Sequence, residues 1–348
     1  MPSYPTLLRS TEDLTAFINE RGYSRCIILT DSNTTEHCLH ALTLSCEPLS
    51  EAEVIEVEPG EGSKSLEVAA GIWQSLLELG TDRNSCLICL GGGMVTDLGG
   101  FVASTFKRGI PYIYVPTSLL ALVDASIGGK TGINLDTAKN QIGSFSWPDA
   151  LYFSTAWLDT LPNREFMAGY AEMYKHALIA DPQHLTALET AVDIGREALY
   201  TLIPASAEIK NSIVARDPHE KGERKILNFG HTAGHAFEAL SLLSNQPLLH
   251  GEAVAAGMCV AIELSSKLRK FDSATATACT SHLLAHFEVM PYFQAYSAEQ
   301  LWAIVQHDKK NDSGNVLFVL LDRIGAAVTD CHVSFDEFNE ALTNIAAR

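Results

Sequence analysis

The pattern of apolar and polar positions predicts strands alternating with helices in the first half of the chain. Apolar runs at residues 24–31 and 51–65 read as strands, the second followed by a turn, and residues 65–80 have apolar positions at helical spacing. Residues 85–106 read as a strand, a triple glycine and a helix. A further strand runs into a loop and helix at 110–126. This alternation predicts an α/β domain with a largely parallel sheet.

The pattern changes after about residue 161. Long helical periodicities cover residues 163–181, 185–217, 230–243 and 251–270, and a strand signal returns only at 315–328. We therefore predict two domains, an α/β domain at residues 1–160 and a mostly α-helical domain at 161–348. An active site is expected in the cleft between them, where ligand sites of two-domain enzymes commonly lie.

Composition and charge narrow the class of protein. The 348 residues exceed what one hydrophobic core usually carries, and 47% hydrophobic with 19% charged residues is an ordinary globular balance. The net charge of -18 argues against binding to nucleic acid or to acidic membranes. No apolar run is long enough to span a bilayer, and the first residues lack the pattern of a signal peptide, so we expect a cytoplasmic protein.

The eight cysteines are scattered, and their only close pair is Cys86 and Cys89. The surrounding segment reads as a buried strand, on which residues three apart point to opposite faces. A redox or zinc pair is therefore not expected there, and the pattern favours reduced thiols.

Two glycine-rich segments are candidates for binding anions. Gly91, Gly92 and Gly93 lie between a strand and a helix, where backbone N–H groups and the helix dipole favour a phosphate, although a tight turn alone would look the same. Residues 124–145 hold Lys130, Lys139 and Asn140 on what read as glycine-rich loops. Such side chains suit a phosphate or carboxylate ligand, and the alternative is a solvated loop.

Further charged residues precede a group of histidines. Glu172 and Lys175 lie three apart on a predicted helix and share a face, as in an ordinary surface ion pair. The candidate site residues that follow are Lys210, Arg224 and Asn228, and each of them is only weak evidence for a site when taken separately.

The histidines suggest a metal site. His231 and His235 lie one helical turn apart, and His250 stands just before a second helix. Catalytic zinc commonly takes three protein ligands and keeps one position open. The ligands could be His231, His235 and a carboxylate, or His231, His250 and a carboxylate, and the spacing does not choose between these sets. Solvated or core histidines are the alternative.

Taken in order, the motifs resemble those of the 3-dehydroquinate synthase family. The resemblance extends from about residue 55 to 328, and the first 50 residues are less diagnostic. The motifs that carry it are PGEGSKS, GGGMVTDLGGFVASTFKRG, VPTSLLALVDASIGGKTGIN, KNQIGSF, TLPNREFMAGYAEMYKHALI, LNFGHTAGHAFEA, LLHGEAVAAGM and DKKND.

The resemblance implies an NAD-binding α/β domain, a helical metal-binding domain and a role for each matching residue. Glu172, His231 and His250 match the ligands of one divalent metal ion, Zn²⁺ or Co²⁺, while His235 faces the substrate. The substrate and catalytic positions are Asp124, Lys130, Asn140, Lys175, Lys210, Arg224, Asn228 and His235, with Arg108 and Lys310 (or Lys309, because the register of the two lysines is ambiguous) at the phosphate. The NAD positions are Asp31, Asn33, Glu61, Lys64, Gly92, Gly93, Val95, Asp97, Thr117, Ser118, Lys139, Thr160, Leu161 and Glu165.

The implied substrate is a small sugar acid phosphate, 3-deoxy-D-arabino-heptulosonate 7-phosphate (DAHP). Its two anionic groups would explain basic residues in an acidic protein. The implied reaction oxidises C5 transiently with NAD, eliminates phosphate, returns the hydride and closes the ring by an internal aldol step to give 3-dehydroquinate in the shikimate pathway. Positioning and charge stabilisation would be the protein's main tasks. Relatives are often homodimers. This chain departs from the family at Ser144 and Trp147.

Three other functions fit parts of this pattern. The first is another sugar-phosphate cyclase, of valiolone or inosose type, although Asn140, Lys210, Asn228 and His235 together resemble the dehydroquinate set. The second is a metal-dependent polyol dehydrogenase, which would form NADH in net amounts. The third is a non-enzymatic NAD sensor, which would release no phosphate from DAHP.

Overall fold

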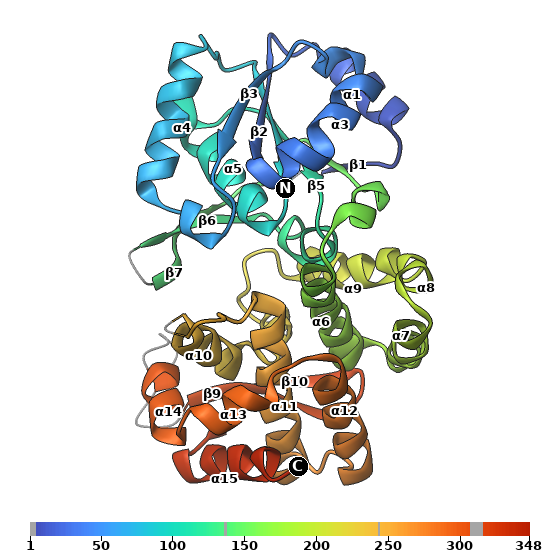
Figure 1. Cartoon of the computed structure of the whole chain (residues 1–348), viewed down its shortest axis with the longest axis vertical. Helices are drawn as coiled ribbons and strands as arrows, with labels where there is room; N and C mark the ends of the chain where they lie inside the picture. Colours follow the sequence, from blue (N-terminus) through green and yellow to red (C-terminus); the bar gives the residue numbers. More distant parts are fainter. Residues whose placement is uncertain (1–4, 136–137, 243, 307–315) are drawn as a thin grey trace. The chain divides into compact units, whose positions relative to one another are not determined.

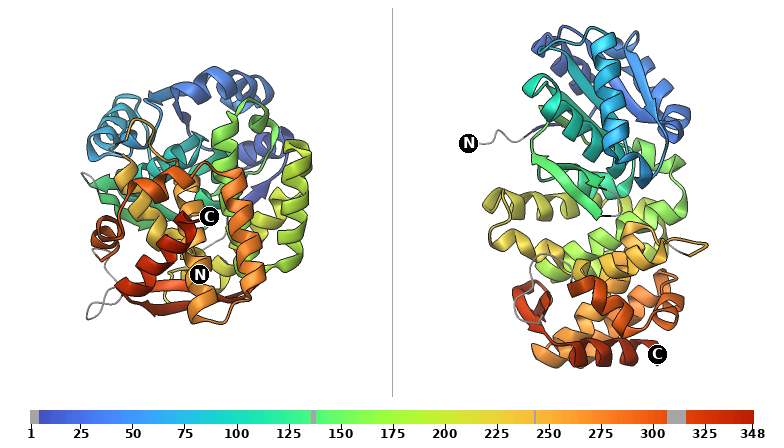
Figure 2. Two further views of the ribbon diagram at one scale, coloured as in Figure 1. Left: turned by 60° about the horizontal axis from the view of Figure 1, so that its bottom comes forward. Right: turned by 90° about the vertical axis from the view of Figure 1, so that its left-hand side faces the viewer.

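The computed structural model describes residues 5–135, 138–242, 244–306 and 316–348 (Figure 1). The chain divides into two compact units, residues 1–162 and 163–348. Unit 1 is α/β and unit 2 is mostly helical (Figures 1 and 2). The predicted fold class is confirmed.

Unit 1 is built on a six-stranded parallel sheet in the order β1-β8-β5-β4-β2-β3. Its strands are β1 (Thr6–Leu8), β2 (Cys26–Asp31), β3 (Glu53–Val57), β4 (Cys86–Gly91), β5 (Tyr112–Pro116) and β8 (Ala150–Tyr152). Every residue of β4 and β5 is buried, as expected for central strands with both faces covered.

Helices cover both faces of this sheet (Figure 1). They are α1 (Thr11–Arg21), α2 (Ser32–Thr34), α3 (His40–Ser45), α4 (Leu66–Glu78) and α5 (Gly93–Thr105). One core lies between the sheet and α4 and α5, and the other between the sheet and α1 and α3. Cys89 belongs to the first core and Cys86 to the second, which confirms that the pair points to opposite faces. All eight cysteines are free thiols.

The segment after β5 differs from the sequence-based prediction. Its lysines and Asn140 were expected on loops, but they lie on an antiparallel hairpin of β6 (Lys130–Leu135) and β7 (Ala138–Phe145). Glycine makes this pairing possible, because a Cβ at Gly143 would lie 2.2 Å from the Thr131 carbonyl oxygen. The sequence pattern also gave no prediction for β1, α1, α3 or β8.

Unit 2 consists of helices around one two-stranded ribbon. The helices are α6 (Asn163–Ala180), α7 (Pro182–Ile194), α8 (Arg196–Tyr200), α9 (Ile203–Arg216), α10 (His231–Ser241), α11 (His250–Leu268), α12 (Ser273–His286), α13 (Met290–Ala295), α14 (Ala298–Gln306) and α15 (Phe335–Ala346). The ribbon pairs β9 (Val316–Arg323) with β10 (Ala326–Val333). Among the described residues, no helix is long and apolar enough to cross a membrane.

The helical pattern predicted at 185–217 forms three helices rather than one. Gly195 has a φ of 132°, which ends α7, and proline in the first turn of α9 marks a new start. Neither residue fits a helix interior, because glycine takes this backbone conformation freely and proline lacks the N–H group.

Candidate functional site

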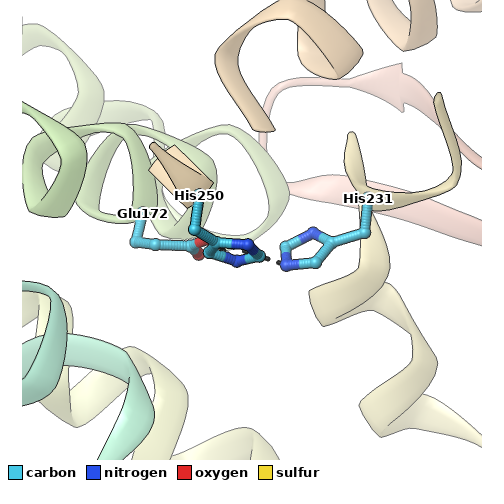
Figure 3. A group of neighbouring side chains, drawn as sticks. All are labelled: Glu172, His231 and His250. Atoms are coloured by element: carbon cyan, nitrogen blue, oxygen red, sulfur yellow. Dashed lines mark ion pairs between the residues drawn. The ribbon is translucent and has the colours of Figure 1, made fainter. Parts of the chain in front are cut away.

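Three side chains from three helices converge in unit 2 (Figure 3). Glu172 comes from α6, His231 opens α10 and His250 opens α11. Nε2 of His231 lies 3.6 Å from Glu172 Oε1, and Nε2 of His250 lies 3.7 Å from the same oxygen. One candidate ligand atom from each residue lies within 4.8 Å of the other two. The arrangement therefore presents two nitrogens and a carboxylate to one point.

Small residues bring α10 and α11 close enough to place the two histidines side by side. A Cβ at Gly257 would lie 1.9 Å from the Gly230 carbonyl oxygen, and one at Gly234 would lie 2.8 Å from the Ala253 carbonyl oxygen. Gly230 also has a φ of 80°, so the turn into α10 uses the left-handed region. The glycines of this segment thus set the distance between the helices.

The other ring nitrogens of the two histidines face groups that can orient them. His231 Nδ1 lies 3.2 Å from the Phe229 carbonyl oxygen, which can only accept, so Nδ1 carries the proton and Nε2 keeps a lone pair. His250 Nδ1 lies 3.5 Å from Oε1 of the buried Glu238. Metal-binding histidines commonly show this pattern, with the second nitrogen held by a carbonyl or carboxylate.

Glu172 supports the same interpretation. Its side chain is fully buried, and its Oε1 accepts no hydrogen bond. Lys175, one turn along α6 and also buried, forms an ion pair with Oε2. A buried carboxylate normally needs several partners, and a metal ion at Oε1 would provide one. The donor set therefore fits a zinc or cobalt ion.

His235 is exposed and lies beside the same group. Its ring centroid is 5.4 Å from that of His231 and 6.1 Å from that of His250. His235, Glu238 and His250 also form a set with ligand atoms within 4.8 Å. Glu238 and His235 lie three apart on α10, so the spacing of the helix could have identified Glu238, which the sequence-based prediction missed.

Every buried lysine and arginine among the described residues is a predicted site residue. They are Lys64, Lys175, Lys210 and Arg224. A cation taken out of water is costly unless anions compensate for it. In unit 2 these are Lys175, Lys210 and Arg224. Buried cations of this kind suit an anionic ligand.

The region before α10 fixes the geometry of Arg224 and Asn228. Both lie in the 3₁₀ segment η7 (Glu223–Asn228), which packs against α6 and α9. Arg224 Nη1 donates to the Pro218 carbonyl at 2.6 Å, and Asn228 Nδ2 donates to Glu220 Oε1 at 2.7 Å. Lys210 lies on α9, which also packs against α6. The predicted cations of unit 2 thus sit on elements that contact the helix bearing Glu172.

In unit 1, the glycine turn opens α5 without a side-chain cap. Gly92 is the N-cap residue, and the first N–H groups of this 13-residue helix follow a buried strand. A Cβ at Gly92 would lie 3.3 Å from the Ser118 hydroxyl, and Thr117 N donates to the Gly91 carbonyl at 3.0 Å. The turn therefore lies at the carboxyl end of β4 and contacts the residues that follow β5. Dinucleotides bind at this edge in open α/β sheets.

Lys64 is the centre of a polar network in the same unit. Its Nζ donates to Asp97 Oδ2 at 2.7 Å and to Asn140 Oδ1 at 2.6 Å, and lies 3.6 Å from Glu61 Oε1. Burial lowers the pKa of Lys64, but the carboxylates of Asp97 and Glu61 outweigh burial, so the net pKa is raised. Asn134 completes the network by donating to Glu61 and accepting from the Asn140 backbone N–H. The network thus connects four predicted site residues, which are Lys64, Glu61, Asp97 and Asn140.

The remaining predicted positions are placed as follows. Asp31 ends β2 and caps α2 through the Thr34 N–H at 3.0 Å, with the exposed Asn33 beside it. Gly93 and the buried Val95 lie in the first turn of α5. Ser118 caps the turn after β5, and Asp124 lies in the π-helical turn η5 (Ala121–Ala125). Lys130 and Lys139 lie on the β6–β7 hairpin. Arg108 is exposed with a φ of 70°, Thr160 and Leu161 end unit 1, and Glu165 lies on α6. Lys309 and Lys310 lie outside the described residues.

Of the two departures from the family pattern, Ser144 lies on β7 of the hairpin and Trp147 lies just after it. The Ser144 hydroxyl lies 2.8 Å from the hydroxyls of both Ser104 and Thr131, which connects β7 with α5 and β6. The Trp147 ring packs so closely on Gly129 that a Cβ there would lie 2.7 Å away. Both residues therefore contribute to packing around the hairpin.

Comparisons with known proteins agree with this picture. Residues 54–168 match the family model described as 3-dehydroquinate synthase N-terminal, and residues 169–311 match that described as 3-dehydroquinate synthase C-terminal. The 3-dehydroquinate synthase of Parabacteroides distasonis is 39% identical over 332 residues, which cover 95% of this chain and 94% of that protein.

Solved structures of sugar-phosphate cyclases show the same fold. One is 2-epi-5-epi-valiolone synthase from Streptomyces hygroscopicus with NAD⁺ and Zn²⁺ bound, with a TM-score of 0.86, 24% identity and coverage of 100% of this chain and 98% of that one. Another is 2-deoxy-scyllo-inosose synthase complexed with carbaglucose-6-phosphate, NAD⁺ and Co²⁺. It has a TM-score of 0.85 and 24% identity, and the match covers 97% of this chain and 96% of that one. At this identity the likeness concerns the fold.

Proposed function

The chain belongs to the 3-dehydroquinate synthase family, and from this premise we propose that it converts DAHP into 3-dehydroquinate and phosphate in the shikimate pathway. The observation that best supports this proposal is the group formed by Glu172, His231 and His250 in a unit with three buried cations. A candidate metal group in a unit that also buries two lysines and an arginine suits a substrate that carries hydroxyls, a carboxylate and a phosphate.

Glu172, His231 and His250 are the proposed metal ligands, with Zn²⁺ or Co²⁺ as the ion. The cofactor NAD is proposed to bind unit 1 at the glycine turn and the Lys64 network. When bound, the metal ion lowers the pKa of a hydroxyl that it contacts, and NAD⁺ accepts and returns a hydride. The two cyclases with NAD⁺ and Zn²⁺ or Co²⁺ support this assignment by their shared fold.

The proposed tasks of the protein's own side chains are binding and orientation. Arg224 presents a planar fork that suits a carboxylate, whereas Lys175 and Lys210 act as point charges. Asn228 and His235 offer hydrogen bonds to substrate hydroxyls, and the Phe229 carbonyl keeps the proton of His231 on Nδ1. Charges held in place before the reaction need no reorganisation during it, which is the main advantage over water.

The remaining substrate positions of the proposal belong mostly to unit 1. They are Asp124, Lys130, Asn140 and Arg108, with Lys310 or Lys309 from the part of the chain outside the described residues. We expect these residues, together with those proposed in unit 2, to hold the phosphate and the carboxylate. A homodimer is the proposed assembly.

The deciding experiment measures phosphate release from DAHP and identifies the product. We expect 3-dehydroquinate and phosphate in equal amounts, loss of activity with a metal chelator and recovery with Zn²⁺ or Co²⁺. A different carbocycle from another sugar phosphate, with none from DAHP, would favour another cyclase. Net NADH formation with glycerol would favour a polyol dehydrogenase.

A further inference from the structure

An arginine at the start of α6 holds the start of α11. Arg164 Nε donates to Glu252 Oε1 at 2.7 Å, and its Nη2 donates to Glu252 Oε2 at 2.7 Å. The same Nη2 donates to the Pro247 carbonyl at 2.7 Å. We call Arg164 and Glu252 the α6–α11 clamp.

The clamp acts on the first turn of α11, where His250 is the first residue. Glu252 Oε2 also accepts a hydrogen bond from the Leu249 backbone N–H at 2.8 Å, so one carboxylate both caps the helix and receives the arginine. Arg164 thereby holds the chain on both sides of His250, through Pro247 before it and Glu252 after it.

Backbone packing restricts the same turn from the other side. A Cβ at Gly251 would lie 2.0 Å from the Ala168 carbonyl oxygen, so α11 begins in direct backbone contact with α6. Glu172 lies one turn beyond Ala168 on α6. The position of His250 relative to Glu172 therefore depends on how these two helix starts are held together.

We propose that Arg164 and Glu252 are positioning residues, which fix His250 at the distance from Glu172 that metal binding needs. This inference rests on the proposed metal ligands Glu172, His231 and His250. Neither clamp residue is one of these ligands. Outer partners of this kind affect affinity because they determine how well the ligands are arranged before the ion binds.

The opposite end of α11 offers a matched control. Arg269 is the C-cap residue of this helix, and its guanidinium forms a similar fork with Asp322 through distances of 2.9 and 3.3 Å. Both arginines are substantially exposed, at 51% for Arg164 and 36% for Arg269. Loss of either fork removes one partly exposed ion pair, but only Arg164 is next to His250.

The test measures zinc affinity of the full-length apoprotein by competition with a chromogenic chelator. We expect Arg164→Ala to weaken zinc binding about tenfold, at the lower end of the range for outer partners of metal ligands. The visible absorption of the Co²⁺ form should change as well, because the ligand geometry changes. Glu252→Gln keeps an acceptor for Leu249 and for Arg164, so it should weaken binding less than Glu252→Ala.

The control and the ligand variant separate the possible failures. A loss of zinc affinity in Arg164→Ala no larger than in Arg269→Ala would overturn the clamp, provided that Glu172→Ala loses the ion. Wild-type zinc binding by Glu172→Ala would instead show that the proposed ligand set is wrong. Should Arg164→Ala fail to fold, Arg164→Lys is compared with Arg269→Lys, since lysine keeps the charge but loses the fork in both.

Discussion

Single residues in unit 2 carry charge where water is excluded. Arg224 is only 2% exposed and Lys175 only 1%, although arginine and lysine are almost always at the surface of proteins. Groups of the protein compensate for this burial, as Glu172 does for Lys175. An anionic substrate would add to this compensation, and two predictions follow from the individual side chains.

Arg224→Lys should lower kcat/KM for DAHP tenfold to a hundredfold, or about 1–3 kcal/mol. Lysine keeps the charge but loses the planar fork and the hydrogen bond to the Pro218 carbonyl. Steady-state kinetics at fixed ionic strength measure the effect. Arg216→Lys is the control, because Arg216 has a fork with Glu223 but is 55% exposed. Equal kcat/KM in both variants would mean that Arg224 does not hold the substrate.

His250→Ala should lose bound metal, whereas His235→Ala should retain it and lose activity. The reason is that His250 faces the fully buried Glu172, while His235 is exposed. Metal content after dialysis, measured by atomic emission, decides between the two ligand sets. Retention by His250→Ala together with loss by His235→Ala would reverse the assignment.

The helices that carry the candidate metal ligands approach one another at glycines, where any larger side chain would prevent the contact. The α10–α11 contact depends on Gly230, Gly234 and Gly257, whose hydrogens face backbone atoms of the other helix. Because these helices begin at His231 and His250, their separation sets the geometry of the candidate metal group. The same glycine contacts therefore stabilise the fold and determine the geometry of the candidate metal group.

Gly257→Ala should destabilise the protein by about 1–3 kcal/mol and weaken zinc binding, because overpacking forces the two helices apart. Urea unfolding and chelator competition measure the two effects. The matched control is Gly71→Ala in α4, where an added Cβ meets no atom within 4 Å. That change should stabilise by roughly 0.5–1 kcal/mol, since alanine favours helices. Similar unfolding midpoints for the two variants would contradict the packing argument.

The contact between α6 and α12 predicts a dependence of stability on pH. The His282 ring stacks on Tyr174 at 4.8 Å, and its Nε2 lies 2.8 Å from the Tyr170 hydroxyl. Burial first, and then the neighbouring His286, lower the pKa of His282 from 6.5 to about 4, with Asp193 opposing them. Between these values the unfolded chain binds a proton that the folded chain does not, so stability falls as pH falls through this range.

The measurement is the urea midpoint at several pH values between about 6.5 and 4. His282→Gln should show a smaller decrease on acidification than the wild type. Tyr170→Phe keeps the imidazole and should retain most of the wild-type decrease. An unchanged decrease in His282→Gln would show that other groups control the acid sensitivity.

The whole molecule combines an acidic composition with buried basic residues. The chain carries a net charge of -18, yet its buried lysines and arginines are all predicted site residues within the described part of the chain. Surface acidity and a basic site are compatible, because fields from exposed charges are screened by solvent and salt while buried charges act at short range. Joint use of both units by one substrate is a prediction of the proposed function.

NAD⁺ should support many turnovers per molecule, because the proposed reaction returns the hydride within each cycle. Phosphate release from DAHP should therefore continue with NAD⁺ far below the substrate concentration, without a matching rise in NADH absorbance. Lys64→Ala, which removes the centre of the unit 1 network, should raise the NAD⁺ concentration needed for half-maximal rate. Stoichiometric NADH would rule out the cyclase cycle.

The sequence by itself determined the class of fold and the identity of the candidate residues. Apolar periodicity predicted the central parallel strands and the long helices, since burial on two faces or on one helical face leaves a direct pattern in the chain. The order of the motifs indicated the family. These features are local, or depend on residue types at fixed spacing, so one chain is enough to reveal them.

Only the tertiary structure decided which of these residues meet. The spacing of His231, His235 and His250 left two ligand sets open, and the family resemblance favoured the set with His250. In the structure Glu172 lies beside His231 and His250 because α6, α10 and α11 pack through glycine contacts. The β6–β7 hairpin, the contact of Glu238 with His250 and the fork between Arg164 and Glu252 were likewise absent from the local pattern. Each depends on partners distant in sequence, whose approach is set by packing between elements rather than by the residues within any one of them.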